Sequence, residues 1–331
     1  MNITLNREPV EVPQQEPTVR QLVDERGLPH KSVVVAVNDE VLRRDEWTTR
    51  KVREGDAVEV IHAVAGGSGR RDDTLEIAGE RFSSRLFLGT GKYPDNATME
   101  AALDASGTEM VTVAIRYMSL DSDSASNGSV LSELDLSRYR LLPNTAGAAD
   151  VAGAVKMARL AREATGTEWV KLEVIGDAAT LWPDTAATIE ATRILVDEGF
   201  VVLPYTSQDL VAALRLEEAG AATVMPLGSP IGSGQGMPDP GIRRIAERVS
   251  VPVVVDAGIG TASEAAMAME LGADAVLVNT AIARAEDPAG MAEAMRRGTE
   301  AGRLARLSGR MPATATASPS SPIAGVPVGG S

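Results

Sequence analysis

Lys171 and Glu173 lie in the apolar core of the segment of residues 167–176. The segment is rich in β-branched residues and ends at Gly176, which predicts a strand. Lys171 and Glu173 are two residues apart, so a strand points both to one side. If that side is the inside of a barrel, burial lowers the pKa of the lysine and makes its amine a nucleophile. The alternative is a lysine at a strand end that pairs with Glu173 and does no chemistry.

A third charged group follows three valines. Asp256 ends the apolar run 253–255, where a carboxylate is costly unless it has a partner or a task. Capping of the helix expected near Thr261 is the alternative explanation. Asn279 and Thr280 end another apolar run in the same way.

Three loops of small residues follow apolar runs late in the chain, at residues 227–236, 257–260 and 279–281. Small residues let backbone N–H groups converge on an anion, although glycines also serve ordinary turns. None of these loops contains lysine or arginine. We therefore expect a phosphate site that uses backbone dipoles instead of side-chain charge.

An amine, two carboxylates and a phosphate site together indicate phosphosugar chemistry. A lysine that attacks a sugar ketone forms a protonated imine, which acidifies the neighbouring C–H bond. The carboxylates can then move protons between sugar carbons. The residues predict a Schiff-base enzyme without fixing its reaction.

Strand and helix patterns alternate through most of the chain. Helical periodicity or alanine-rich composition marks residues 148–164, 183–198, 207–219, 262–271 and 288–306. Between such segments we expect eight strands, at residues 86–88, 110–115, 140–142, 169–174, 200–203, 222–226, 253–256 and 275–278. This pattern predicts an α/β fold, a (β/α)8 TIM barrel, with its active site at the carboxyl ends of the strands. A doubly wound sheet is the competitor, but the early Gly-x-Gly-x-x-Gly motif is missing.

A smaller unit precedes the barrel. A hairpin (residues 1–5 and 9–12), a helix (18–26) and two strands (33–37 and 56–61) predict a small mixed sheet on one helix. The expected domains are residues 1–67, ending Gly66-Gly67, then a linker at 68–73, a barrel at 74–312 and a disordered tail at 313–331.

Composition excludes several classes of function. The net charge of −14 argues against nucleic-acid binding. The chain lacks a long apolar run and a signal peptide, so we expect no membrane association and a cytoplasmic protein. It also lacks cysteine, and its two histidines, His30 and His62, both precede the barrel. The barrel therefore has no thiol nucleophile, no Ser-His-Asp triad and no histidine metal site.

The first unit resembles the ubiquitin-like sulfur-carrier protein of thiamin biosynthesis, a small β-grasp domain. The resemblance rests on the order of elements and on the ending VAGG at residues 64–67. In that family the terminal glycine is adenylated and converted to a thiocarboxylate. The resemblance therefore implies that Gly67 is the sulfur-carrying terminus and that an adenylating, sulfur-transferring enzyme is a partner.

Residues 74–312 resemble thiazole synthase of the same pathway. The resemblance is carried by motifs in the expected order: VTVAIR at 111–116, LLPNTAG at 141–147, VKLEVI at 170–175, PLGSPIGSG at 226–234, DAGIGT at 256–261 and ELGADAVLVNTA at 270–281. It implies that Lys171 forms an imine with 1-deoxy-D-xylulose 5-phosphate and that Glu173 and Asp256 are the acid/base pair. It implies that the substrate and its phosphate are held by Gly232, Ala257, Gly258, Asn279 and Thr280.

The resemblance also implies the other components of the reaction. Sulfur comes from the carrier thiocarboxylate, and nitrogen and the remaining carbons come from dehydroglycine, made by a separate enzyme. No metal and no cofactor are expected, and the family forms homo-oligomers. Without the resemblance, two alternatives stay open: a phosphosugar Schiff-base aldolase of another pathway, and a non-catalytic interaction protein with a ubiquitin-like domain.

The fusion of the two units poses a chemical problem. A thiocarboxylate requires a free carboxyl terminus, yet Ser68 follows Gly67. We therefore expect the chain to be cleaved after Gly67, within the linker.

Overall fold

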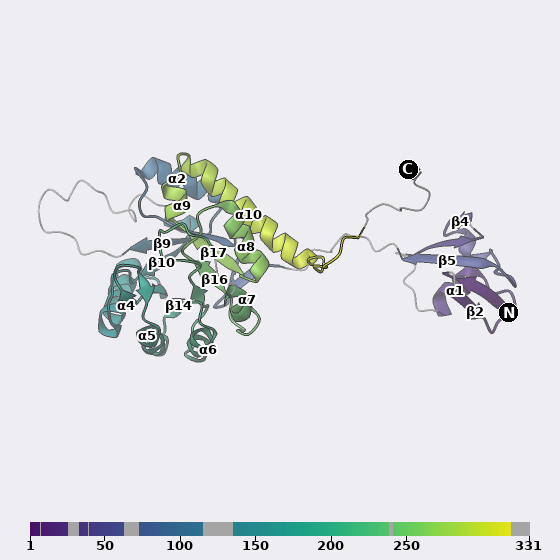
Figure 1. The fold of residues 1–331 in the computed structure, drawn as a ribbon, viewed down its shortest axis with the longest axis horizontal. Helices are drawn as coiled ribbons and strands as arrows, with labels where there is room; N and C mark the ends of the chain where they lie inside the picture. Colours follow the sequence, from purple (N-terminus) through teal and green to yellow (C-terminus); the bar gives the residue numbers. More distant parts are fainter. Residues whose placement is uncertain are drawn as a thin grey trace, which may run out of the picture. The chain divides into compact units, whose positions relative to one another are not determined.

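A computed structural model describes residues 1–6, 8–25, 33–38, 40–62, 73–114, 135–237 and 241–318. The chain divides into two compact units, Met1–Asp73 and Thr74–Ser331 (Figure 1).

The first unit is a five-stranded sheet packed on one helix. The strand order is β2-β1-β5-β3-β4, with β1 and β5 parallel and the other pairs antiparallel. Its elements are β1 (Asn2–Leu5), β2 (Glu8–Glu11), α1 (Val19–Glu25), β3 (Val33–Val37), β4 (Glu40–Leu42), a 3-10 turn (Glu46–Thr48) and β5 (Ala57–His62). Val19, Leu22 and Val23 of α1 pack on the sheet in one core. This β-grasp arrangement confirms the predicted fold, to which the structure adds the short strand β4.

The second unit contains eight parallel strands. In chain order they are β8 (Leu86–Gly89), β9 (Met110–Ala114), β10 (Arg140–Asn144), β11 (Trp169–Leu172), β14 (Val201–Thr206), β15 (Met225–Pro226), β16 (Val254–Asp256) and β17 (Ala275–Val278). The sheet order runs β15-β14-β11-β10-β9-β8-β17-β16. A parallel bridge between Val224 and Val253 joins the two outer strands. The predicted TIM barrel is confirmed, and the doubly wound alternative is wrong.

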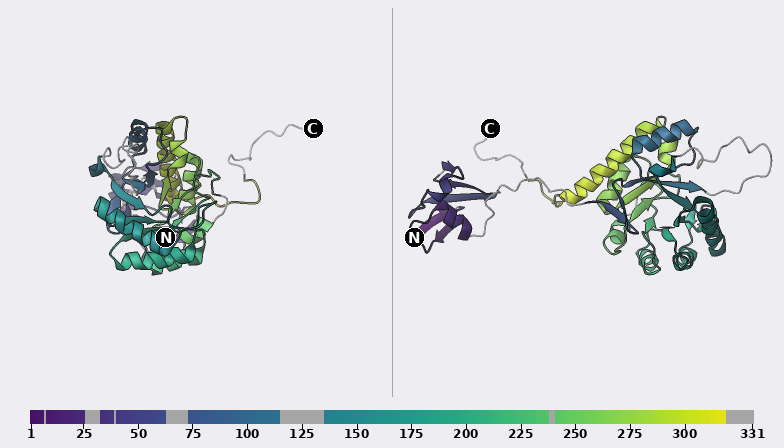
Figure 2. Two further views of the ribbon diagram at one scale, coloured as in Figure 1. Left: turned by 90° about the vertical axis from the view of Figure 1, so that its left-hand side faces the viewer. Right: turned by 180° about the vertical axis from the view of Figure 1, so that it is seen from behind.

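Helices cover the outside of the barrel (Figures 1 and 2). They are α2 (Asn96–Ser106), α4 (Val151–Thr165), α5 (Thr185–Asp197), α6 (Leu210–Glu218), α7 (Gly241–Ala246), α8 (Ala262–Leu271), α9 (Thr280–Ala283) and α10 (Pro288–Ser308). Aspartate side chains accept hydrogen bonds from the backbone N–H groups of the first turn in five of them, at Asp95, Asp150, Asp184, Asp209 and Asp287. Such caps fix where these helices begin, just beyond the strand ends.

Two short hairpins lie at opposite ends of the strands. The hairpin β6 (Leu75–Ile77) and β7 (Glu80–Phe82) packs its apolar side chains against the barrel interior near the first residues of the strands. The hairpin β12 (Ile175–Asp177) and β13 (Trp182–Pro183) follows shortly after Glu173. The first covers the amino end, so the carboxyl end is the one available for a site.

The barrel interior is apolar toward the amino ends of the strands and polar at their carboxyl ends. Side chains of alternate residues point inward, and one interior layer includes Trp169, Leu142, Val254 and Leu277. Two residues further along the same strands, the inward positions are Lys171, Asn144, Asp256 and Asn279. The period of two therefore brings these polar residues to one end of the barrel.

Candidate active site

Lys171, Glu173 and Asp256 meet inside the barrel at the carboxyl ends of β11 and β16. Lys171 Nζ lies 2.5 Å from Asp256 Oδ2 and 3.2 Å from Glu173 Oε1. The three side chains are only 4–6% exposed. We call these residues the buried trio. The predicted pairing of Lys171 with Glu173 is present, but the ammonium group is buried in the interior instead of reaching the surface at the strand end.

The backbone around Glu173 is fixed by a buried threonine. The strand β11 ends at Leu172, one residue before Glu173, so the predicted strand end at residue 174 is slightly too late. Thr145 Oγ1 donates to the carbonyl of Glu173 and accepts from its N–H, both at 2.8 Å. Thr145 also donates its N–H to the carbonyl of Lys171. These bonds keep the Glu173 side chain beside Lys171 after the sheet has ended.

The trio sets the protonation of its members. Burial acts to lower the pKa of Lys171, but the charges of Asp256 and Glu173 act more strongly and hold it above the ordinary lysine value. The expected low lysine pKa is therefore wrong for the free protein, because burial was considered without the second carboxylate. Burial also raises the pKa of Glu173, with Lys171 opposing this effect and Asp256 adding to it. The site thus favours the ammonium form of Lys171 and acts to keep a proton on Glu173.

Asp256 does not cap the following helix. The N-cap residue of α8 is Thr261, and Glu264 accepts from the N–H groups of Gly260 and Thr261. Asp256 instead contacts Lys171. The capping alternative is wrong, and the carboxylate is free to act on the lysine.

The loops after β15 and β16 are locked together by their backbones. Ala257 and Gly258 both have left-handed φ values, of 75° and 83°. Their carbonyls accept from Gly228 and Gly236. A Cβ atom on Gly258 would lie 2.3 Å from the backbone nitrogen of Ser229, so only glycine fits there. A left-handed alanine next to Asp256 is a strained conformation of the kind found at functional sites.

Backbone donors remain available in these loops. Among the hydrogen bonds of the described residues, none uses the N–H groups of Gly232, Gly258 or Thr280. The side-chain Oδ1 atoms of Asn144 and Asn279 are buried and accept no hydrogen bond from the described part of the chain. A ligand rich in hydroxyl groups with one anionic end would satisfy both sets.

The sequence analysis did not single out one side chain near these loops. Lys92 follows β8, which neighbours β17 in the barrel. The point where a Cβ atom on Gly232 would lie is 3.7 Å from Lys92 Nζ and 3.6 Å from Thr280 Oγ1. The three loops themselves contain no cation, as the sequence shows, but Lys92 brings one close to Gly232. Only the barrel topology could have revealed this lysine.

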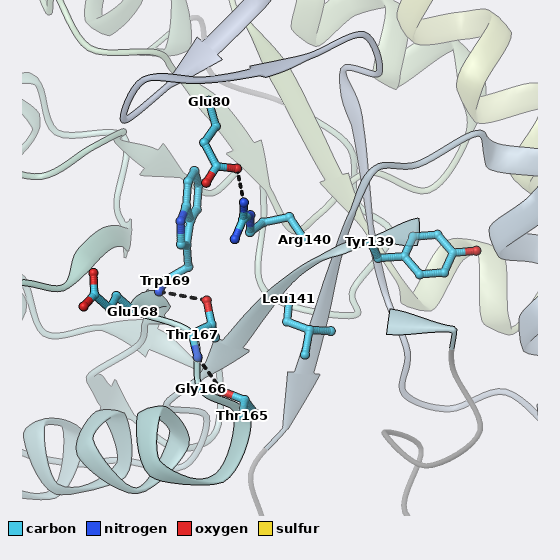
Figure 3. Close-up of a pocket in the computed structure, with 9 residues that line it drawn as sticks. All are labelled: Glu80, Tyr139, Arg140, Leu141, Thr165, Gly166, Thr167, Glu168 and Trp169. Atoms are coloured by element: carbon cyan, nitrogen blue, oxygen red, sulfur yellow. Dashed lines mark hydrogen bonds and ion pairs between the residues drawn. The ribbon is translucent and has the colours of Figure 1, made fainter. Parts of the chain in front are cut away.

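A separate pocket of about 460 Å³ lies at the opposite end of the barrel (Figure 3). It is lined by the first residues of β10 and β11, Arg140 and Trp169, and by Glu80. The guanidinium of Arg140 pairs with Glu80 and lies 5.5 Å from the Trp169 ring centroid. Arg140 and Glu80 therefore satisfy each other, at the end of the strands away from the trio.

The remaining expectations fall partly outside the described residues. Gly67, the linker at 68–72 and the tail from residue 319 lie there. No group of three or more potential metal ligands occurs among the residues that the structure describes. Within the same residues, no helix is both long and apolar enough to cross a membrane.

Comparison with known proteins gives the family. Residues 76–322 match the family described as thiazole biosynthesis protein ThiG, and residues 3–67 match the ThiS family. The thiazole synthase of Myxococcus xanthus is 56% identical over 257 residues, which are 77% of this chain and 98% of that protein. The thiazole synthase of Paramagnetospirillum magneticum is 46% identical over 310 residues, 93% of this chain and 95% of that protein. That second match is too long for the barrel unit alone, so it extends into the first unit.

Among solved structures, a chain of the Amycolatopsis orientalis BexX/CysO complex is similar. It is 39% identical with a TM-score of 0.65, and the match covers 73% of this chain and 98% of that one.

Proposed function

Because the chain belongs to the ThiG family of thiazole biosynthesis proteins and carries a ThiS-family unit at its N-terminus, we propose how its site forms the thiazole of thiamin. The protein is an enzyme, a thiazole synthase of thiamin biosynthesis. The observation that carries the proposed mechanism is the contact of one buried amine with two carboxylates at the barrel mouth.

The first step is imine formation at Lys171. The ammonium group transfers a proton to Asp256, whose Oδ2 is 2.5 Å away, and becomes a neutral amine. The amine nitrogen then bonds to the ketone carbon of 1-deoxy-D-xylulose 5-phosphate, and the ketone oxygen leaves as water with one proton from the nitrogen and one from Asp256. The product is a protonated imine that lies between the same two carboxylates. The charges that raise the lysine pKa therefore stabilise this cation as well.

The next steps are proton transfers along the sugar. The protonated imine withdraws electrons, so the carbon beside it can lose a proton to Glu173 or Asp256. Because burial raises the pKa of Glu173, this residue holds a proton to higher pH than an ordinary glutamate and can return one to the sugar. The two carboxylates thus act as the acid/base pair that moves the carbonyl function along the chain.

Substrate binding is divided between the loops and the interior amides. The free N–H groups of Gly232, Gly258 and Thr280, with those of Ala257 and Asn279, bind the phosphate. The orphaned Oδ1 atoms of Asn144 and Asn279 accept from sugar hydroxyl groups. The ring then closes with sulfur from the carrier thiocarboxylate and with dehydroglycine.

Reductive trapping tests the imine. Borohydride converts the imine of the wild-type protein and substrate into a stable secondary amine, and peptide mapping locates it. We expect the label on Lys171, its loss in Lys171→Ala and its retention in Lys156→Ala, an exposed lysine of α4. A label on another lysine, or none, would refute the mechanism.

The sulfur carrier requires a free terminus at Gly67. We propose cleavage after Gly67, followed by adenylation and sulfur transfer by a separate enzyme. Intact-mass analysis of protein from its native host should show a fragment that ends at Gly67, partly with sulfur in place of one terminal oxygen. Finding only full-length chain in active cells would contradict cleavage and leave the first unit as a docking module.

Two expectations concern the assembly. We propose that the protein forms a homo-oligomer, which the family supports. We also propose a cytoplasmic location, because the charge of a phosphorylated substrate keeps that substrate inside the cell. Light scattering after size-exclusion chromatography and fractionation of host cells test them.

A further inference from the structure

Lys92 reaches across three loops of the barrel mouth. It belongs to the loop between β8 and α2, yet its Nζ lies near Gly232 of the loop after β15, and Thr280 after β17 lies near the same glycine. A small space next to Gly232 is thus bordered by an ammonium group and a hydroxyl group. A Cβ atom would occupy it, so glycine keeps it open.

The backbone at Lys92 is held in an unfavourable conformation. Its φ is 72°, in the left-handed region that lysine seldom adopts. The preceding residues are fixed by packing, because a Cβ atom on Gly89 would lie 2.6 Å from the side chain of Asn279. The end of β8 therefore packs closely against Asn279, the residue that follows β17. A long side chain kept in a strained backbone at a candidate site suggests a task for that side chain.

The charge of Lys92 is not used within the described residues. No carboxylate of the described residues pairs with it, whereas Lys51 pairs with Glu16 in the first unit. The buried trio has no net positive charge whether Glu173 is ionised or protonated, and the chain carries −14. A phosphate dianion at this mouth needs a nearby cation more than an additional backbone donor.

We infer that Lys92 binds the substrate phosphate beside Gly232 and Thr280, and so selects a phosphorylated sugar over its unphosphorylated form. The inference rests on the proposed function and adds a charged residue to a phosphate site built from backbone groups. Lys92 does not touch the reacting carbon, so it acts in binding and not in the imine chemistry.

The test compares imine trapping with 1-deoxy-D-xylulose 5-phosphate and with unphosphorylated 1-deoxy-D-xylulose. In Lys92→Met we expect the half-saturating concentration of the phosphosugar to rise about 10- to 100-fold, the range for loss of one charged hydrogen bond. The value for the unphosphorylated sugar should not change. Lys92→Arg should stay close to wild type, and Lys156→Met is the matched control with an exposed lysine.

A glycine variant separates charge from backbone strain. Lys92→Gly relieves the left-handed conformation, so a structural role predicts normal or better binding, whereas a phosphate role predicts the same loss as Lys92→Met. An equal effect on both sugars, or none on either, would overturn the inference.

Direct phosphate binding keeps this test independent of the imine. Titration with inorganic phosphate, followed by calorimetry, should show weaker binding to Lys92→Met than to wild type. If wild-type protein traps neither sugar, the imine mechanism fails, while the phosphate titration still decides the role of Lys92.

Discussion

Two lysine–glutamate pairs in this chain have nearly the same length and opposite surroundings. Lys51 Nζ lies 3.1 Å from Glu16 in the first unit, and both side chains are more than half exposed. Lys171 Nζ lies 3.2 Å from Glu173 in the barrel, with both side chains 6% exposed and Asp256 as a third member. Water screens the charges of the first pair, whereas the charges of the buried second pair are screened by little water and interact mainly with each other and with Asp256. The distance between a lysine and a glutamate therefore does not identify a site. Burial of the pair, together with a second carboxylate beside the one lysine, does.

The largest difference between the two pairs is expected in the loss of stability when the lysine of each pair is removed. Lys171→Met leaves two carboxylates buried without a cation, which should lower the free energy of unfolding of the barrel by about 3–5 kcal/mol. Hydrogen exchange of peptides from each unit, measured by mass spectrometry, would report it. The Lys156→Met protein should match wild type, and an unchanged barrel in Lys171→Met would show that the trio is not strongly coupled.

The next effect separates the two roles within the trio. Asp256→Asn keeps the shape of the side chain but removes the nearer carboxylate, so imine formation slows, with Glu173 left to accept the lysine proton, and proton transfer along the sugar slows further. We expect deuterium exchange from solvent into the substrate carbon beside the imine to fall about 10²–10⁴-fold by NMR. Equal loss of trapping and exchange would instead confine the role of Asp256 to imine formation.

A smaller effect concerns pH. Burial raises the folded-state pKa of Glu173, so between the ordinary glutamate value and the raised one the folded protein binds more protons than the unfolded chain. Stability contributed by this residue is present at low pH and falls as pH rises, by at most about 1.4 kcal/mol per pH unit. Glu173→Gln should remove that slope in denaturant unfolding measured across pH. Parallel curves for the two proteins would contradict the raised pKa.

The smallest effect is expected in the exposed pair. Lys51→Met should change the stability of the first unit by only about 0.2–1 kcal/mol, and less at high salt. Peptides of β5 in the same hydrogen-exchange experiment measure it. A loss as large as that of Lys171→Met would show that burial does not separate the two pairs.

Much of this comparison was accessible from the sequence. The alternation of residues along strands placed Lys171 and Glu173 on one side and predicted all eight barrel strands, because side-chain direction follows a local period. Glycine-rich loops marked Gly232 and Gly258 because left-handed turns and close backbone approaches need glycine. Short elements such as β4, three residues long, and the hairpin of β12 and β13 were missed, since so few residues carry no periodic signal.

The sequence by itself determined the order of elements, the barrel, the family and the set of polar residues at the strand ends, all of which follow from local patterns and motifs. Only the tertiary structure decided the direction of the Lys171 pKa and the approach of Lys92 to Gly232. Both depend on which distant residues meet. An electrostatic effect is set by distances through space, and β17 becomes the neighbour of β8 only when the barrel closes.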